Sequence, residues 1–286
     1  MSLHVAAGHH GLIVTSEDGR SWAESRLGKE GEVFRAGAAG NGRVVLAGSF
    51  GGSRLFASSA DGKAWETVQQ DAKYALYVRG FGFFDGRFMA LAGDPGAVGE
   101  ARPTAFFSRD GLAWEEPVPL GGKWMLRRVA AGNGRYVAVG DRGRVAHSTD
   151  LRAWTDVKGT TPADSFIDIA FGKGVFVGVG LHGLRATSAD GVAWERFRGE
   201  EGEHLNAVLW TGDRFDAVGQ STTYVSADGK AWTRHAVTDG PLTATCGRGV
   251  FLGTAWRGRI LRSEDGIAWK EVHKASQPVE AVVIQP

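Results

Sequence analysis

Cysteine is nearly absent from this chain, since Cys246 is the single one among 286 residues. One thiol cannot form an internal disulfide, and it excludes a metal site built from several cysteines. Proline, with eight residues, and tyrosine, with four, are also scarce. No apolar run reaches the roughly eighteen residues that a transmembrane helix needs, so we expect no membrane span.

The chain also lacks an excess of charge of either sign. Its 33 lysines and arginines and its 32 acidic residues give a net charge of +1. Bulk charge therefore gives no reason to expect nucleic acid or a membrane surface as a partner. The first residues enter a strand-like stretch directly and lack the apolar region of a signal peptide. We expect a cytoplasmic monomer, with a periplasmic or secreted protein as the alternative if a leader has been removed.

Glycine, in contrast, is abundant, because 43 glycines are about twice the usual share of about 7%. Six of them belong to copies of one phrase, Ser-x-Asp-Gly-x-x-Trp, and Leu151 takes the place of glycine in its fourth copy. The seven copies are Ser16–Trp22, Ser59–Trp65, Ser108–Trp114, Ser148–Trp154, Ser188–Trp194, Ser226–Trp232 and Ser263–Trp269. Their tryptophans are 43, 49, 40, 40, 38 and 37 residues apart. A period near forty with turn chemistry in each unit indicates a repeat architecture.

Each repeat holds four short runs of β-branched, aromatic and aliphatic residues, separated by turns of glycine, asparagine and aspartate. Four antiparallel strands in each of seven units predict an all-β, seven-bladed β-propeller that forms a single domain. The expected blades are 279–286 with 3–27, then 32–70, 76–118, 124–158, 165–198, 204–237 and 241–274. The chain starts in a second strand and ends in a first strand. We therefore predict that residues 279–286 complete the N-terminal blade and close the ring, which protects the sheet edges.

The repeated phrase is predicted to form the turn between the third and fourth strands. Its aspartate can accept turn N–H groups, its glycine can take a positive φ, and its tryptophan can bury its ring between blades. We predict a structural role for these residues: Asp18, Trp22, Asp61, Trp65, Asp110, Trp114, Asp150, Trp154, Asp190, Trp194, Asp228, Trp232, Asp265 and Trp269. A left-handed leucine costs about 1 kcal/mol, so we expect a different turn at Leu151.

With this phrase the chain resembles the Asp-box, or BNR-repeat, propellers, whose usual box is one residue longer and reads Ser-x-Asp-x-Gly-x-x-Trp. The resemblance covers essentially the whole chain and implies the propeller fold, with boxes that lie away from any active site. The superfamily includes six-bladed sialidases, seven-bladed glucanase modules, ten-bladed sortilin-type receptors and seven-bladed photosystem II assembly factors. Blade number and small size are most similar to the last of these, although fold alone does not imply function.

The two faces of the predicted ring differ. The turns between first and second strands and between third and fourth strands are short and repeated, and they should lie on one face. The opposite face should carry the loops between second and third strands and the links between blades, including the longest insertion, 94–103. These segments vary, and binding residues concentrate on variable loops of a rigid fold.

Arginine recurs at one position of the first strand in three consecutive blades, as Arg35, Arg79 and Arg127, and Arg128 follows directly. The other blades have Ile167, Asn206, Thr243 and Glu280 there. Neighbouring loops add further arginines, which are Arg54, Arg102, Arg142 and Arg144. Because guanidinium groups pair with carboxylate or phosphate, we predict a site for an anion or an acidic partner at the mouth of the central channel. The alternative is that these arginines pair with acids such as Asp94, Asp141 or Asp168 and brace adjacent blades.

Two tryptophans outside the repeated phrase, Trp124 and Trp256, should lie on the same variable face. Each could stack on a sugar or anchor a protein partner, or else pack against a neighbouring loop. His182 lies in a loop equivalent to that of His9 and His10, and we include it among the candidate ligand-binding residues. These loops lie on different sides of the ring, so we predict no metal site.

Catalytic residues are not evident. Glycoside hydrolysis needs a pair of carboxylates, one with a raised pKa, and the acids of the variable face form no recognisable pair. A sialidase-like site would add a tyrosine nucleophile with a glutamate partner, and none of the four tyrosines has an obvious one. We therefore predict no catalytic residue and no cofactor. The favoured function is a non-catalytic binding or assembly scaffold for a protein partner or an anionic ligand, and the alternative is a glycan-binding or glycan-cleaving propeller.

Overall fold

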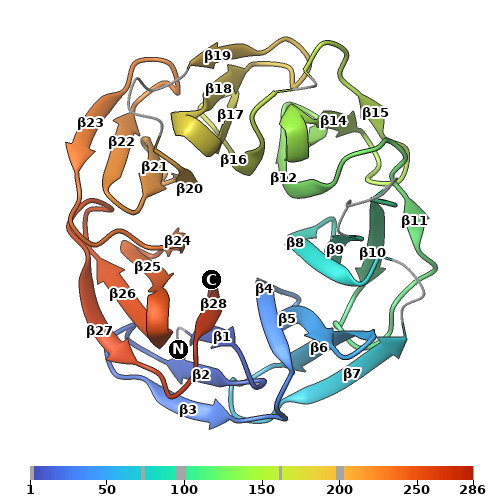
Figure 1. Cartoon of the computed structure of the whole chain (residues 1–286), viewed down its shortest axis with the longest axis vertical. Coiled ribbons are helices and arrows are strands. Elements are labelled where there is room, and N and C mark those ends of the chain that lie inside the picture. Colours follow the sequence, from blue (N-terminus) through green and yellow to red (C-terminus); the bar gives the residue numbers. More distant parts are fainter. Residues whose placement is uncertain (1–2, 72–74, 95–100, 161–162, 198–202, 286) are drawn as a thin grey trace.

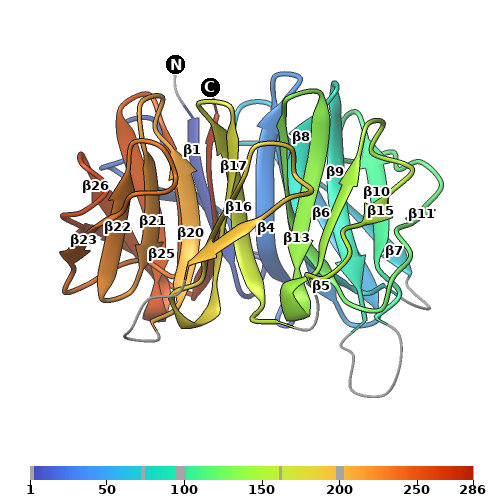
Figure 2. The same cartoon turned by 90° about the horizontal axis from the view of Figure 1, so that it is seen from above.

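The structure is a computed structural model that describes residues 3–71, 75–94, 101–160, 163–197 and 203–285. In these residues, 28 strands form seven four-stranded antiparallel sheets, which stand radially around one axis (Figure 1). Figure 2 shows the ring from its edge, where the strands run from one face to the other. The predicted seven-bladed β-propeller is therefore confirmed. No helix within the described ranges is long and apolar enough to cross a bilayer.

The strands nearest the axis are β28 (Val279–Gln285), β4 (Val33–Gly40), β8 (Tyr77–Phe84), β12 (Leu126–Gly132), β16 (Phe166–Gly172), β20 (Leu205–Trp210) and β24 (Thr243–Gly247). The second strands are β1 (Leu3–Gly8), β5 (Arg43–Phe50), β9 (Arg87–Gly93), β13 (Arg135–Gly140), β17 (Val175–Gly180), β21 (Phe215–Gly219) and β25 (Val250–Ala255). The third strands are β2 (Ile13–Ser16), β6 (Ser53–Ser59), β10 (Thr104–Ser108), β14 (Val145–Ser148), β18 (Arg185–Ser188), β22 (Thr222–Ser226) and β26 (Arg259–Ser263). The outer strands are β3 (Ala23–Arg26), β7 (Glu66–Asp71), β11 (Val118–Pro119), β15 (Thr155–Asp156), β19 (Glu195–Phe197), β23 (Thr233–Ala236) and β27 (Lys270–Lys274). Below, blade 1 is the sheet of β28, β1, β2 and β3, and blades 2 to 7 follow in chain order.

The two ends of the chain share blade 1. Strand β28 pairs antiparallel with β1, from Leu3 opposite Gln285 to Gly8 opposite Val279, in the sheet order β28-β1-β2-β3. The pairing supplies the inner strand that the N-terminal repeat lacks, so the predicted closure of the ring is confirmed.

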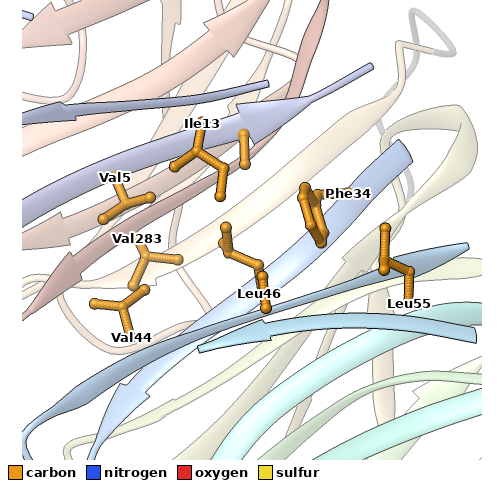
Figure 3. Packing of buried hydrophobic residues seen from close by; sticks show 9 residues of the cluster. Val5, Ile13, Phe34, Val44, Leu46, Leu55 and Val283 are labelled. Atoms are coloured by element: carbon orange, nitrogen blue, oxygen red, sulfur yellow. The ribbon is translucent and has the colours of Figure 1, made fainter. Parts of the chain in front are cut away.

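The core lies between neighbouring blades. One cluster joins Val5 and Val283 of blade 1 to Phe34 and Leu46 of blade 2, all of them at most 5% exposed (Figure 3). Six further clusters of the same kind surround the axis. Burial of apolar side chains in these clusters holds each blade to the next, because a single four-stranded sheet cannot cover both of its own faces.

The turns between first and second strands have the positive φ angles predicted for Asn-Gly and Asp-Gly hairpins, for example 49° at Asn41 and 71° at Gly42. The Asn41 amide also donates to the carbonyl oxygens of Gly86 and Arg109 in the next blade, both at 2.9 Å. Gly86 lies in the same kind of turn and Arg109 in the repeated phrase. These two kinds of turn therefore share one face, called the motif face below, and the opposite face is called the loop face.

The repeated phrase forms one hydrogen-bonded turn, as blade 5 illustrates. The Asp190 carboxylate accepts the N–H groups of Val192 and Ala193 at 2.8 and 2.9 Å, and Ser188 Oγ accepts the N–H of Gly191 at 2.8 Å. The Trp194 indole N–H then donates to the Gly191 carbonyl at 3.0 Å. Each motif tryptophan is half-buried, and each packs against a different one of the seven clusters.

The expectation of a different turn at Leu151 is wrong. Leu151 adopts φ 65°, its N–H donates to Ser148 Oγ at 2.9 Å, and its carbonyl accepts the Trp154 indole N–H at 2.9 Å. The leucine side chain is fully buried in a cluster with Met89 and Phe107 of blade 3. Burial of a leucine contributes about 1.5–3 kcal/mol, which exceeds the cost of the left-handed backbone, so the turn is kept.

The motif tryptophans give a direct test of this packing. Trp65→Ala should lower the free energy of unfolding by about 3 kcal/mol, because Trp65 packs on the blade 1–2 cluster and its indole N–H donates to the Gly62 carbonyl. Urea unfolding followed by fluorescence or circular dichroism measures the change. Trp256→Ala is the control, because Trp256 is 67% exposed and its loss should change stability by less than about 0.5 kcal/mol. Equal stability of the two variants would contradict the structural role of Trp65.

Candidate binding site on the loop face

Residues on the loop face are placed by β-bulges at the start of the first strands. In six of the seven blades, two residues of the first strand oppose one residue of the second strand, as between Phe34 and Ala36 of β4. The extra residues are Glu280, Arg35, Arg79, Arg127, Ile167 and Asn206. A bulge redirects the side chain of the extra residue out of the regular alternation. The arginine position recognised in the sequence is therefore a bulge position.

Two of the bulge arginines are paired with carboxylates. Arg35 Nη1 lies 2.5 Å from Glu280 Oε2, and the other oxygen of Glu280 lies 2.6 Å from His9 Nε2. Arg127 Nε lies 2.5 Å from Asp141 Oδ1. The side chains of both arginines are about one-third exposed, at 35% and 29%. Both arginines therefore face the surface, but their charges are largely compensated.

Arg128 belongs to a polar network that connects the inner strands of neighbouring blades. Its guanidinium donates to the carbonyl of Arg79 and lies 3.8 Å from Asp168, whose other oxygen accepts the N–H of Val208 at 2.9 Å. Burial raises the pKa of Asp168 and lowers the pKa of Arg128, and each charge opposes the shift of the other. The network connects blades 3, 4, 5 and 6. Arg128 thus contacts groups of adjacent blades, the kind of contact that the alternative interpretation of the sequence describes.

Arg79 differs from these three arginines. Its side chain is exposed, and no carboxylate of the described residues lies within ion-pair distance. Partial desolvation, followed by the charges of Arg127 and Arg35, lowers the pKa of Arg79. Neighbouring positive charges that are not fully compensated favour the binding of an anion at this point.

A cavity of about 300 Å³ lies beside Arg79 on the loop face, between blades 3 and 4. We call it the blade 3–4 cavity, and its polar and aromatic walls are Tyr77, Arg79, Asp94, Trp124, Arg127, Asp141 and Arg142. Three guanidinium groups thus face two carboxylates and two aromatic rings in one hollow. The surface is suited to a ligand that carries negative charge next to an apolar or aromatic group.

Trp124 is held in place by arginines on two sides. The guanidinium of Arg142 lies 5.6 Å from the centre of its ring, and the buried Arg144 donates to its carbonyl at 2.5 Å. Arg144 also pairs with Asp156 at 2.8 Å. Arg142 is at the tip of the turn η1 (Asp141–Gly143), with φ 55°, and is exposed without an ion pair in the described part of the chain. Trp124 is therefore a preorganised wall, and Arg142 is a second available cation.

The structure places the other predicted binding residues outside this cavity. Arg54, 8% exposed, stacks on Phe106 at 4.2 Å, and Arg144 is 3% exposed, so neither guanidinium is available at the surface. Arg102 is exposed, and residues 95–100 of the predicted insertion lie outside the described residues. His182 is exposed in the turn η2 (Leu181–Gly183), where its ring lies 3.1 Å from Asp164. Trp256 lines a separate cavity between blades 7 and 1.

Sequence reasoning missed Tyr77, and it named Arg142 only as one of several arginines in loops near the predicted site. Tyr77 is two residues before Arg79 and lines the same cavity. Because Arg79 is a bulge residue, strand alternation alone does not predict that the two side chains meet there. Arg142 occupies the same left-handed turn position as His182 and Arg257. That repeated turn was visible in the sequence as similar short loops, and alignment of these loops would have placed Arg142 at the tip of its turn.

The fold and this surface define a seven-bladed β-propeller with an arginine- and tryptophan-lined cavity on its loop face. The chain matches no protein-family description and no curated protein sequence. Among solved structures, a catalytically inactive virginiamycin B lyase from Staphylococcus aureus with quinupristin is similar with a TM-score of 0.71 and 9% identity, over 93% of this chain and 94% of that chain.

Two further similar structures are complexes. YCF48 bound to a D1 peptide has a TM-score of 0.62 and 17% identity, over 84% of this chain and 81% of that chain. A nidogen/laminin complex has a TM-score of 0.59 and 10% identity, over 100% of this chain and 99% of that chain. At these identities the likeness shows the seven-bladed propeller fold, and function has to be argued from the site.

Proposed function

We propose that this protein is a non-catalytic binding scaffold that holds an acidic segment of a protein partner in the blade 3–4 cavity. The observation that carries the proposal is the exposure of Arg79 and Arg142, neither of which is ion-paired in the described ranges, beside Trp124 in one hollow. Arginine and tryptophan are the residues that most often dominate the energy of protein interfaces. The two similar structures that contain a peptide or a protein partner support the same class of function.

The turns of the motif face support a relationship to the Asp-box propellers. The aspartate accepts two turn N–H groups, the serine accepts a third, and the tryptophan packs between blades, in the order of the Asp-box phrase. We propose that the chain carries shortened Asp boxes. On this proposal the boxes stabilise the ring, and function is left to the loop face.

Arg79→Glu combined with Arg142→Glu should weaken capture of the partner by roughly tenfold or more, because reversal of interfacial charges replaces attraction by repulsion. The measurement is a pull-down from the native source with quantitative mass spectrometry. Raising the ionic strength from about 0.15 M to about 1 M should weaken capture by the wild-type protein, because the Debye length falls from about 8 to about 3 Å.

Arg109→Glu is the control, since it makes the same kind of substitution once, in blade 3 on the motif face. Partners retained by this variant and lost from the double variant are the specific ones. Equal capture by the wild-type protein and the double variant would overturn the proposed site. The melting temperature of the double variant is measured separately. It should differ little from that of the wild-type protein, because both replaced side chains are exposed.

A glycan-cleaving propeller is the alternative, and one observation favours it. Asp94 and Asp141 line the same cavity, and paired carboxylates are required for glycoside hydrolysis. Asp141 is already ion-paired with Arg127 at 2.5 Å, so Asp94 is the carboxylate to test. Release of sugar from a panel of glycan substrates, abolished by Asp94→Asn, would favour this alternative over the scaffold.

A further inference from the structure

A second cavity of about 310 Å³ lies on the loop face between blades 7 and 1. We call it the Trp256 cavity, and most of its walls are apolar, from Leu242, Ala255, Trp256, Pro278 and Val279. Trp256, in the turn η3 (Trp256–Gly258), is 67% exposed, more than any other large apolar side chain in the described part of the chain. Exposure of such a side chain beside an apolar hollow is typical of an interaction site.

The turn that carries Trp256 is held in one conformation. Arg257 at its tip has φ 65°, and Arg259 Nε donates to the Trp256 carbonyl at 3.4 Å while its other nitrogens bind Asp239 at 2.6 and 2.9 Å. Arg259 and Arg144 stand at the same strand position, four residues before the motif serine, and each binds the carbonyl of a loop-face tryptophan. The two cavities are therefore built alike, each with a supported tryptophan and a tip arginine.

A buried threonine also lines the Trp256 cavity. Thr254 is 1% exposed, and its Oγ1 has no hydrogen-bond partner among the described residues. A buried polar group without a partner costs free energy, so a ligand that pairs with this hydroxyl recovers that cost. The backbone N–H or C=O group of a peptide is suited to this role, whereas a purely apolar ligand is not.

Charge at the rim specifies the ligand further. Arg257 is exposed and forms no ion pair within the described ranges, so it can receive a carboxylate. Glu280 on the inner side of the cavity is already bound by Arg35 and His9. Glu280 lines the Trp256 cavity, its partner Arg35 lies in blade 2, and Arg79 of the blade 3–4 cavity occupies the equivalent bulge of blade 3. These three consecutive bulge positions lie between the two cavities on the loop face.

We propose that the Trp256 cavity receives a large apolar side chain of the same acidic segment that binds in the blade 3–4 cavity. In this arrangement the apolar side chain packs on Trp256, a backbone group of the segment pairs with Thr254 Oγ1, and an acidic residue next to it meets Arg257. The inference rests on the proposed function, and it names the chemistry of the partner: an extended peptide with acidic residues and one aromatic or large aliphatic anchor. Such an anchor in a supported pocket is the usual source of most binding energy.

The test uses a phage-displayed library of random 12-residue peptides, which reach about 40 Å when extended. Selection on the full-length wild-type protein should enrich peptides with acids at a fixed spacing from one large apolar residue. Fluorescence polarisation then gives the Kd of the best peptide for each variant. Trp256→Ala should weaken binding at least tenfold, Thr254→Val several-fold, and Arg109→Glu on the motif face should leave binding unchanged.

A double-mutant cycle makes the assignment specific. Replacement of the apolar anchor of the peptide by alanine should weaken binding to the wild-type protein, and it should cause little further loss with the Trp256→Ala variant. Melting temperatures establish that the variants are folded, which the 67% exposure of Trp256 predicts.

Each remaining outcome is decisive. If Arg79→Glu with Arg142→Glu abolishes peptide binding while Trp256→Ala does not affect it, the proposed function stands and the Trp256 subsite is wrong. A selection that enriches no peptide overturns both. A glycan array with the same protein tests carbohydrates as the other ligand class. Glycan binding that is lost in the Trp256→Ala variant would show that Trp256 binds a sugar, and the peptide proposal for this cavity would be wrong.

Discussion

Deletion of residues 279–286 is expected to lower the melting temperature by about 10–20 °C and to promote aggregation. The deleted segment contains β28, in which Val279, Ala281 and Val283 are at most 5% exposed. Two buried valines and one alanine together contribute about 5 kcal/mol, which is comparable with the whole stability of many domains. The deletion also leaves β1 as an exposed edge strand, and such edges pair with other chains.

Differential scanning calorimetry and light scattering measure both effects. A synthetic peptide of residues 276–286 added to the truncated protein should restore much of the melting temperature, because it can pair with β1 in the same register. A peptide of the same composition in scrambled order is the control. If the truncated protein melts like the full chain, β28 does not close the ring in solution.

Acidification is expected to destabilise the ring steeply below pH about 4, through the seven motif aspartates. The pKa of every one of them lies below its ordinary value. At Asp18, Asp61, Asp150, Asp190 and Asp228 the largest cause is a backbone N–H that donates to the carboxylate. At Asp110 and Asp265 burial is the largest influence and raises the pKa, but the backbone and serine donors together outweigh it.

The direction of the pH dependence follows from these shifts. A carboxyl group whose pKa is lower in the folded protein stabilises the fold above the unfolded pKa of about 3.9. That contribution is lost as the pH falls from there through the folded pKa, because the unfolded chain binds the protons more tightly. Up to seven protons are therefore taken up on unfolding in this range.

Urea unfolding midpoints between about pH 2 and pH 7 test this prediction over the window in which aspartates titrate. The comparison variant combines Asp61→Asn, Asp190→Asn and Asp228→Asn, which keep an acceptor oxygen for the turn N–H groups but do not titrate. Its midpoint should fall less steeply with pH than that of the wild-type protein. Parallel curves for the two proteins would show that the acid sensitivity arises elsewhere, for example in ion pairs.

The fold could be predicted from the sequence because its signals are local and repeated. Each repeated turn is specified by residues at most six positions apart, and a surplus strand at one end matches a missing strand at the other. The exception, Leu151, depends on a contact with Met89 about sixty residues away in the chain. A turn rule could not anticipate that burial would outweigh backbone strain.

The sequence predicted the residue types of the candidate site, but it did not predict which arginines are paired with carboxylates. Arg35, Arg79 and Arg127 occupy equivalent bulges, yet only Arg79 is exposed without a carboxylate in the described ranges. The Arg35–Glu280 pair joins residues 245 positions apart and follows from ring closure, which makes blades 1 and 2 neighbours. Tyr77 and Arg142 reach the cavity through the local geometry of a bulged strand and of a loop, for which no single motif exists.

The bulges also bear on how such a molecule can acquire new specificity. A bulged residue lies outside the alternation that fills the interblade core, so its replacement changes the surface without creating a void in the interior. Six blades offer one such residue each, and the present set ranges from glutamate through isoleucine and asparagine to arginine. Combinatorial libraries that vary only these positions would present many combinations of side chains around the loop face without altering the fold. Substitutions at the same bulge positions would allow related chains to bind different ligands while they keep the propeller fold.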